Sequence, residues 1–163
     1  MSQVLIIMGS DSDLPIMNKA IDILEYFNIS FEMRISSAHR TPDRTHRIIK
    51  EFNGEVIIVG AGAAAHLAGV VAAYTVKPVV AIPIDATSLN GVDALYATAQ
   101  MPSGIPVATM AINGSKNAAI FAAHILALSD SAMNEKLIAY RKDMAETVYK
   151  KDMELTKKLQ KEH

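Results

Sequence analysis

Apolar positions follow two different periods, which alternate along the chain between residues 3 and 128. Short runs of apolar, often β-branched residues predict strands that are buried in a sheet. Between these runs, apolar residues recur at helical spacing, as at Met17, Ala20 and Leu24, and this spacing predicts helices with one buried face. The predicted strands span residues 3–8, 30–35, 55–60, 78–84 and 105–112.

A helix is predicted after each of these strands. The first begins at Ser12 or Asp13, either of which is a good N-cap, with Pro15 in its first turn. The later helices are predicted at 42–52, 63–75, 92–100 and 117–128. Regular alternation of strands and helices predicts a parallel sheet with helices on both faces.

Five strands in a chain of this length fit a three-layer α/β/α sandwich, a flavodoxin-like doubly wound sheet with strand order 2-1-3-4-5. In the second strand, Phe31, Met33 and Ile35 alternate with polar residues. Such alternation indicates a solvated face or an edge position. An edge position for the second strand agrees with the predicted order.

The segment 131–160 predicts one long helix with an apolar stripe that runs from Leu137 through Met144 and Val148 to Leu159. A solvated terminal helix is the simpler interpretation. Because apolar stripes are normally buried, we expect the helix to pack on a neighbouring subunit.

Length and composition narrow the class of protein. With 163 residues, half of them hydrophobic, the chain is expected to form a single catalytic domain, 1–163, with its α/β core over 1–128. The 16 basic and 17 acidic residues give a net charge of -1, which argues against non-specific binding to nucleic acid or to an anionic membrane. The absence of cysteine excludes disulfides, thiolate catalysis and cysteine-type zinc sites.

No targeting signal or membrane span is expected from the sequence. The first residues lack the basic region and the length of apolar run that a signal peptide needs, and no apolar stretch reaches the roughly 20 residues of a membrane span. We therefore expect a cytoplasmic protein with no membrane partner.

Three polar or glycine-rich segments, at 9–13, 36–42 and 60–66, follow the first, second and third strands. Doubly wound sheets bind ligands at the carboxyl ends of their strands. Because these three strands are neighbours in the predicted order, we expect the three segments to meet over one crevice.

The residue types in this crevice suggest a phosphorylated sugar. Ser10 and Ser12 at a helix start favour an anion, and the guanidinium of Arg40 matches a phosphate or carboxylate. Asp13 would bind sugar hydroxyl groups or cap the helix. His39 is suited to a proton shuttle, because an ordinary histidine pKa is about 6.5.

The residues of this crevice also admit other interpretations. The sequence GAGAAAH resembles a dinucleotide-binding G-x-G-x-x-A, but it follows the third strand and leaves little chain for a substrate domain. A signalling receiver would need an aspartate at the end of that strand, where none stands. A metal site built from His39, His66 and Asp13 lacks supporting ligand spacing. No metal or cofactor is expected. His66 alone could equally be a residue that begins a helix.

Two further segments look functional. The polar, proline- and glycine-rich stretch 85–106 has the character of a lid. The stretch 112–119 could direct a helix start toward the same crevice or toward that of a neighbouring subunit.

The chain also carries a set of family motifs between about residues 3 and 128: GSDSD, SAHRTP, GAGAAAHL, LNGVDALY, QMPSGIPVAT and KNAA. Together they resemble the 5-(carboxyamino)imidazole ribonucleotide mutases of purine biosynthesis, also called the catalytic subunit of phosphoribosylaminoimidazole carboxylase. The resemblance implies conversion of that ribonucleotide to 4-carboxy-5-aminoimidazole ribonucleotide, by loss of CO2 and its return to carbon 4. The other branch of the family carboxylates aminoimidazole ribonucleotide directly with CO2, and it is the alternative. The AAHL segment matches the mutase branch.

The resemblance also implies roles for particular residues. Ser10 and Arg40 would bind the phosphate and Asp13 the ribose. His39 would be the proton shuttle, and His66 a second catalytic residue that polarises the carboxylate or walls the pocket. The remaining implied binding residues are Ser12, Ser37, Ala38, Gly62, Ala63 and Leu67.

Family likeness extends to partners. It implies a homo-octamer with sites built between subunits and with the C-terminal helix reaching across. It also implies an ATP-dependent synthase that supplies the labile substrate.

Three positions depart from the family pattern: Ala63 replaces a glycine, Ala68 replaces a proline, and Ser103 stands where many mutases carry a different residue. The sequence leaves open whether these departures change the branch or the retention of CO2.

Overall fold

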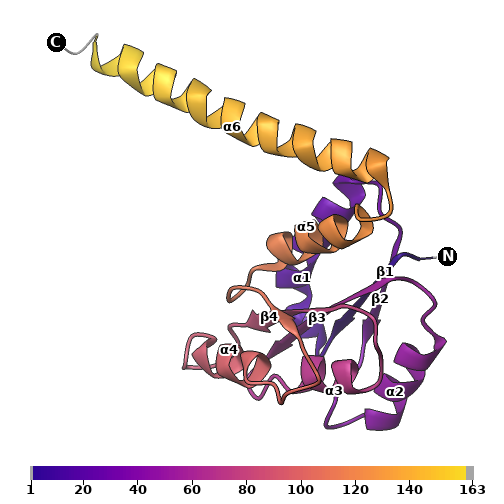
Figure 1. The fold of residues 1–163 in the computed structure, drawn as a ribbon. Helices are drawn as coiled ribbons and strands as arrows, with labels where there is room; N and C mark the ends of the chain where they lie inside the picture. The colour runs from indigo at the N-terminus through magenta and orange to yellow at the C-terminus, as the bar shows by residue number, and fades with distance from the viewer. Residues whose placement is uncertain (1, 161–163) are drawn as a thin grey trace. The chain divides into compact units, whose positions relative to one another are not determined.

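A computed structural model describes residues 2–160 and contains a five-stranded parallel sheet (Figure 1). The strands are β1 (Val4–Met8), β2 (Phe31–Ile35), β3 (Val56–Gly62), β4 (Val79–Ile84) and β5 (Ala108–Thr109). Their order is β2-β1-β3-β4-β5, and every neighbouring pair is parallel. The predicted fold class and strand order are therefore confirmed.

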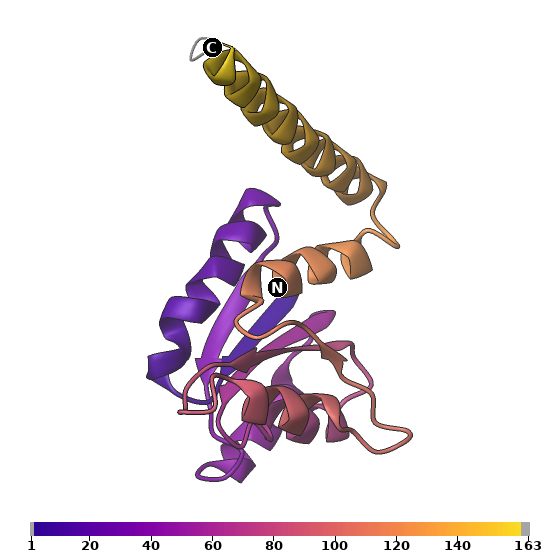
Figure 2. The ribbon, with the colours of Figure 1, turned by 90° about the vertical axis from the view of Figure 1, so that its left-hand side faces the viewer.

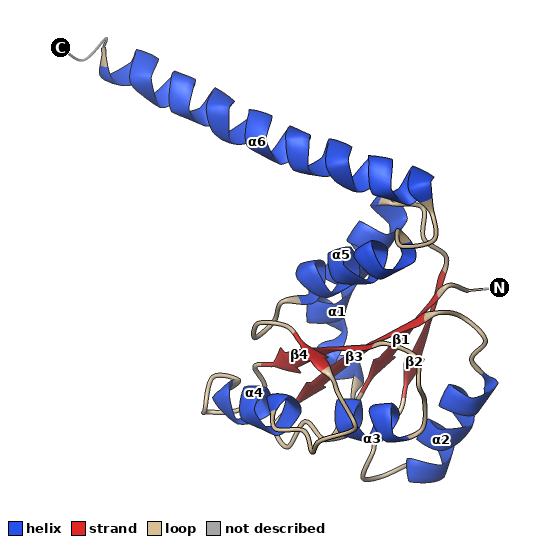
Figure 3. Ribbon diagram, viewed as in Figure 1, coloured by secondary structure: helices blue, strands red, loops and turns tan. Residues whose placement is uncertain are grey.

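Helices cover both faces of this sheet. They are α1 (Leu14–Tyr26), α2 (Pro42–Glu51), α3 (Leu67–Ala73), α4 (Val92–Ala99) and α5 (Ser115–Leu126). A further helix, α6 (Ser131–Leu159), follows them in the chain. Figures 1 and 2 show α1 and α5 on one face and α2, α3 and α4 on the other. The colouring by element in Figure 3 makes the three layers plain.

The central strands account for most of the core. Every residue of β1 and β4 is buried, as are all residues of β3 except Gly62. On one face, Leu5, Ile57 and Val59 pack in a cluster with residues of α2, α3 and α4. Burial on both faces explains why these strands read as unbroken apolar runs.

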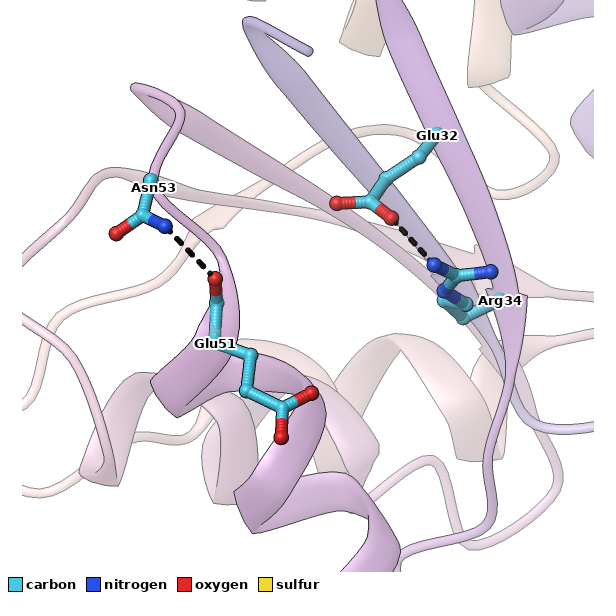
Figure 4. Close-up of polar contacts among 4 residues, drawn as sticks. All are labelled: Glu32, Arg34, Glu51 and Asn53. Carbon is cyan, nitrogen blue, oxygen red and sulfur yellow. Dashed lines mark hydrogen bonds and ion pairs between the residues drawn. The ribbon is translucent and has the colours of Figure 1, made fainter. Parts of the chain in front are cut away.

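The second strand lies at the sheet edge, as predicted. It pairs with β1 alone, and none of its residues is fully buried. Arg34 donates to Glu32 over 2.8 Å on this edge (Figure 4). The same view shows Asn53 donating to the main-chain oxygen of Glu51, where α2 ends. Charged residues on an edge strand disfavour pairing with another sheet.

Two local predictions were wrong in their extent. The predicted helix at 63–75 is helical only over α3, because Ala63 and Ala65 have φ angles of 52° and 42° and form a turn. The predicted strand at 105–112 is reduced to the two residues of β5. Alanine-rich or apolar composition alone did not reveal these interruptions.

The start of α1 also differs from the prediction. A short 3-10 helix, η1 (Asp11–Asp13), precedes α1, and its N-cap is Ser10. Asp13 stands at the N-cap position of α1 without a side-chain cap bond, and Pro15 lies in the first turn as expected. The serine that caps this segment is therefore Ser10 and not Ser12.

The chain divides into two compact units, which meet in sequence at Ile125 and Leu126. The second unit holds α6, which begins at its N-cap Asp130. Met144, Val148, Leu155 and Leu159 are each about half exposed or more. Among residues 2–160, no helix combines the length and the apolar character that crossing a membrane requires.

Candidate functional site

A cleft of about 400 Å³ lies at the carboxyl ends of β1, β2 and β3. The three predicted segments form its walls, because their strands are neighbours in the sheet. Every residue predicted for the site lines it: Ser10, Ser12, Asp13, Ser37, Ala38, His39, Arg40, Gly62, Ala63, His66 and Leu67. The predicted crevice therefore exists.

The turn after β1 is organised around Ser10. Its hydroxyl accepts a hydrogen bond from the main-chain N–H of Ser12 over 3.3 Å and lies 2.9 Å from the Ser12 hydroxyl. In return, the Asp13 carboxylate accepts from the main-chain N–H of Ser10 over 3.0 Å. This reciprocal capping box holds two serine hydroxyls at the cleft wall.

Asp13 is the buried acid of the cleft, with a relative exposure of 5%. Desolvation by burial raises the pKa of Asp13 above its ordinary value, and the negative charge of Asp11 adds to this effect. Hydrogen bonds from the main chain of Ser10 and Gly9 act in the opposite direction without cancelling it. A carboxyl group held in this way can accept or donate hydrogen bonds to sugar hydroxyls.

The second segment turns sharply because its hydroxyl groups bond within it. Ser36 is buried, and its hydroxyl lies 2.8 Å from that of the buried Thr45 on α2. The hydroxyl of Thr41 accepts from the main-chain N–H of Ser37 over 2.9 Å. Ser36 is thus structural, whereas Ser37 lines the cleft.

Arg40 is exposed at the tip of this turn. Its main-chain N–H donates to the Ser37 hydroxyl over 3.2 Å, and its Nε lies 3.5 Å from the same oxygen. Arg40 also lines an adjoining groove of about 470 Å³, where Arg44 adds a second guanidinium. Arg44 was not predicted for the site, although its position only four residues after Arg40 indicated a second cation near the same turn. This end of the cleft suits an anion.

The third segment provides the apolar wall. A Cβ on Gly62 would lie 2.5 Å from the Cβ of Ala86, so that glycine permits a close approach of the loop after β4. Ala86 also lines the cleft and was not predicted. Gly60, which precedes Gly62 on the same strand, similarly leaves room for the side chain of Met17, whose sulfur would clash with a Cβ at that position.

His39 and His66 meet across the cleft. The Nε2 atom of His39 lies 2.8 Å from the Nδ1 atom of His66. Their ring centroids are 5.0 Å apart, and the ring planes cross at 79°. His66 lies in the cleft directly beside the candidate proton shuttle, and it is also the N-cap residue at which α3 begins.

The two other segments expected to be functional lie differently. From 85–106, only Ala86 reaches the cleft, and no residue of 112–119 lines it. Asn113 instead accepts from the main-chain N–H of Asp85 over 3.0 Å, which ties the loops after β4 and β5 together. Within residues 2–160, no three His, Asp or Glu side chains are grouped so that they could hold a metal ion.

The chain is similar to known proteins along most of its length. A model of the family described as AIR carboxylase matches residues 3–147. The N5-carboxyaminoimidazole ribonucleotide mutase of Methanocaldococcus jannaschii is 53% identical over 91% of this chain and 94% of its own length. The mutase of the same name from Pyrococcus abyssi is 54% identical over 88% of this chain and 84% of its own.

A solved structure is similar throughout the fold. The crystal structure of Treponema denticola PurE superposes with a TM-score of 0.86 and 31% identity, covering 93% of this chain and 97% of that one. The agreement therefore extends from local motifs to the arrangement of the whole sheet.

Proposed function

The chain belongs to the AIR carboxylase family, and on that basis we propose that it interconverts N5-carboxyaminoimidazole ribonucleotide and 4-carboxy-5-aminoimidazole ribonucleotide. It is thus an isomerase of purine biosynthesis that moves a carboxyl group from nitrogen to carbon. The observation that carries this proposal is one cleft that combines an anion-binding end, a buried carboxyl group, a histidine pair and an apolar wall.

Each part of the cleft matches one part of the substrate. Ser10, Ser12, Ser37 and Arg40 offer hydroxyl groups and a guanidinium to the phosphate. Asp13 is placed to bind the ribose hydroxyls. The flat aminoimidazole would then extend toward the histidines and the apolar wall.

The wall suits a small neutral molecule. It is built from the aliphatic side chains of Ala61, Ala63, Ala64, Ala65, Leu67 and Ala86. The carbamate loses CO2 readily, and CO2 carries no charge. Apolar side chains around it would keep it beside the imidazole, so that recapture is effectively intramolecular.

The chemistry needs one proton carrier. Loss of CO2 requires a proton at the exocyclic nitrogen. Attack of carbon 4 on CO2 then leaves a proton on an sp3 carbon, and a base must remove it to restore the aromatic ring. His39 lines the cleft and is the proposed carrier of both protons.

The cellular setting follows from the substrate. Because the carbamate is labile, we propose that an ATP-dependent synthase supplies it close by, and we place both enzymes in the cytoplasm. The exposed apolar stripe of α6 (Met144, Val148, Leu155 and Leu159) supports assembly into a homo-oligomer, for which we propose an octamer.

Product formation from two starting materials tests the reaction. One sample contains N5-carboxyaminoimidazole ribonucleotide generated in place, and the other contains aminoimidazole ribonucleotide with a modest concentration of bicarbonate. Rapid conversion of the first sample alone is expected. Rapid conversion of the second would instead identify a direct carboxylase and would mean that the departures at Ala63 and Ala68 change the branch.

A further inference from the structure

The hydrogen bond between His39 and His66 constrains which nitrogen can carry a proton. One hydrogen lies between Nε2 of His39 and Nδ1 of His66, which are 2.8 Å apart, so one ring donates and the other accepts. Among residues 2–160, neither Nδ1 of His39 nor Nε2 of His66 has a hydrogen-bond partner. The pair therefore has two possible polarities.

Only one polarity survives a change in the charge of His39. When His39 is an imidazolium ion, both of its ring nitrogens are donors, so His66 must accept. If His66 donated instead, the bond would break whenever His39 became protonated. A bond from His39 Nε2 to His66 Nδ1 can persist in both states.

We propose that His66 is a positioning residue, which accepts the Nε2–H hydrogen bond of His39 and thereby makes Nδ1 of His39 the single atom that carries protons. This inference rests on the proposed function. A hydrogen-bond acceptor beside a catalytic histidine fixes the tautomer and the orientation of its ring, and we assign this role to His66. His66 itself exchanges no proton with the substrate.

The proton balance is simple under this arrangement. The Nδ1–H of the His39 imidazolium gives its proton to the exocyclic nitrogen as the bond from nitrogen to the carboxyl carbon breaks, and the bonding pair stays on nitrogen. Carbon 4 then forms its bond to CO2. Nδ1 takes the proton from carbon 4, the electron pair returns to the ring, and His39 ends as the imidazolium with which it began.

The matched variants are His66→Asn and His66→Leu. The Asn carbonyl oxygen is as many bonds from Cα as Nδ1 is and can accept the same hydrogen bond, whereas Leu has the same branching and no acceptor. Because His66 is exposed, both variants are expected to fold. The control is His46→Gln, since His46 stacks on Tyr74 and does not line the cleft.

We expect His66→Leu to lower kcat by about 100-fold with KM within about twofold, as for a misplaced catalytic group. His66→Asn should recover most of that loss, and His46→Gln should match the unaltered protein. Equal losses of kcat in the Asn and Leu variants, or a change confined to KM, would overturn the positioning role.

Nitrogen-15 spectra of the full-length protein, labelled at histidine and measured under mildly alkaline conditions, read the tautomers without turnover. A bare Nδ1 on His66 with a protonated Nε2 on His39 supports the assignment, and a protonated Nδ1 on His66 overturns it. If the unaltered protein converted neither starting material, the proposed function would fail, while these spectra would still decide the direction of the bond.

Discussion

The hydroxyl groups of Ser36 and Thr45 lie 2.8 Å apart, and both residues are buried. This contact fastens the start of the second cleft segment to α2, while the next residue, Ser37, lines the cleft. Two adjacent serines therefore serve different purposes.

Replacing each serine should separate stability from binding. Ser36→Ala is expected to lower the free energy of unfolding by about 1 kcal/mol, because Thr45 loses a buried partner. Ser37→Ala should raise KM and change stability by less than about 0.5 kcal/mol. Urea unfolding and steady-state kinetics measure the two effects, and a raised KM with unchanged unfolding in the Ser36 variant would contradict the division.

Ala63 occupies a conformation that favours glycine, with a φ of 52°. A left-handed alanine costs about 1 kcal/mol, partly offset by the greater freedom of glycine in the unfolded chain. Ala63→Gly should therefore raise the free energy of unfolding by about 0.5 kcal/mol.

Ala64→Gly is the matched control for Ala63→Gly, because Ala64 is a neighbouring exposed alanine whose φ is not positive. Its free energy of unfolding should fall by about 0.4–1 kcal/mol, because glycine has more conformational entropy than alanine in the unfolded chain. The midpoints of urea unfolding report the change in stability of both variants, provided that the dependence of the unfolding free energy on urea concentration is unchanged. If Ala63→Gly lowered the free energy of unfolding as much as Ala64→Gly does, backbone strain at Ala63 would be refuted.

Asp13 should make stability depend on pH. Its pKa in the folded protein is raised, chiefly by burial, above the ordinary value of 3.8. Between pH 3.8 and the raised pKa of the folded protein, the folded state therefore binds more protons than the unfolded chain. The free energy of unfolding falls as the pH rises through this range. Asp13→Asn should abolish this fall.

Urea unfolding at several values between about pH 4 and pH 7 checks the Asp13 prediction. Asp152→Asn serves as the control, because Asp152 is exposed on α6, and it should keep the pH dependence of the unaltered protein. If the stability of Asp13→Asn fell with pH as steeply as that of the unaltered protein, a group other than Asp13 would be the cause.

Arg40 should bind the substrate phosphate. Arg40→Ala is expected to raise KM by about ten- to a hundredfold with little change in kcat, because a charge-assisted hydrogen bond to a phosphate is lost. Arg47→Ala, on an exposed site of α2 that does not line the cleft, should leave KM within about twofold. The same KM in both variants would remove Arg40 from the phosphate site.

The apolar stripe of α6 should mediate assembly. Met144→Lys places a charge on the stripe and is expected to lower the mass observed by sedimentation. Met153→Lys makes the same change at a similarly exposed methionine on another face of the helix and should leave the mass unchanged. Removal of residues from 131 onward should have the effect of Met144→Lys, and an unaltered mass in all three proteins would refute the interface.

The sequence by itself determined the strand order and the three segments of the cleft. Strand and helix periods are local properties of the chain, and the edge position of β2 could be inferred from its alternation. Because neighbouring parallel strands end at the same edge of a sheet, the meeting of Ser10, His39 and His66 followed from the order alone.

Only the tertiary structure decided how those residues are used. The bond between His39 and His66, the burial of Ser36 beside an exposed Arg40, and the approach of Ala86 to Gly62 depend on distances between segments far apart in the chain. The turn at Ala63 and Ala65 replaces the first residues of the expected helix because the backbone there must connect β3 to α3, which overrides the helical preference of alanine. Local pattern specifies elements, whereas side-chain geometry across elements arises only when they pack.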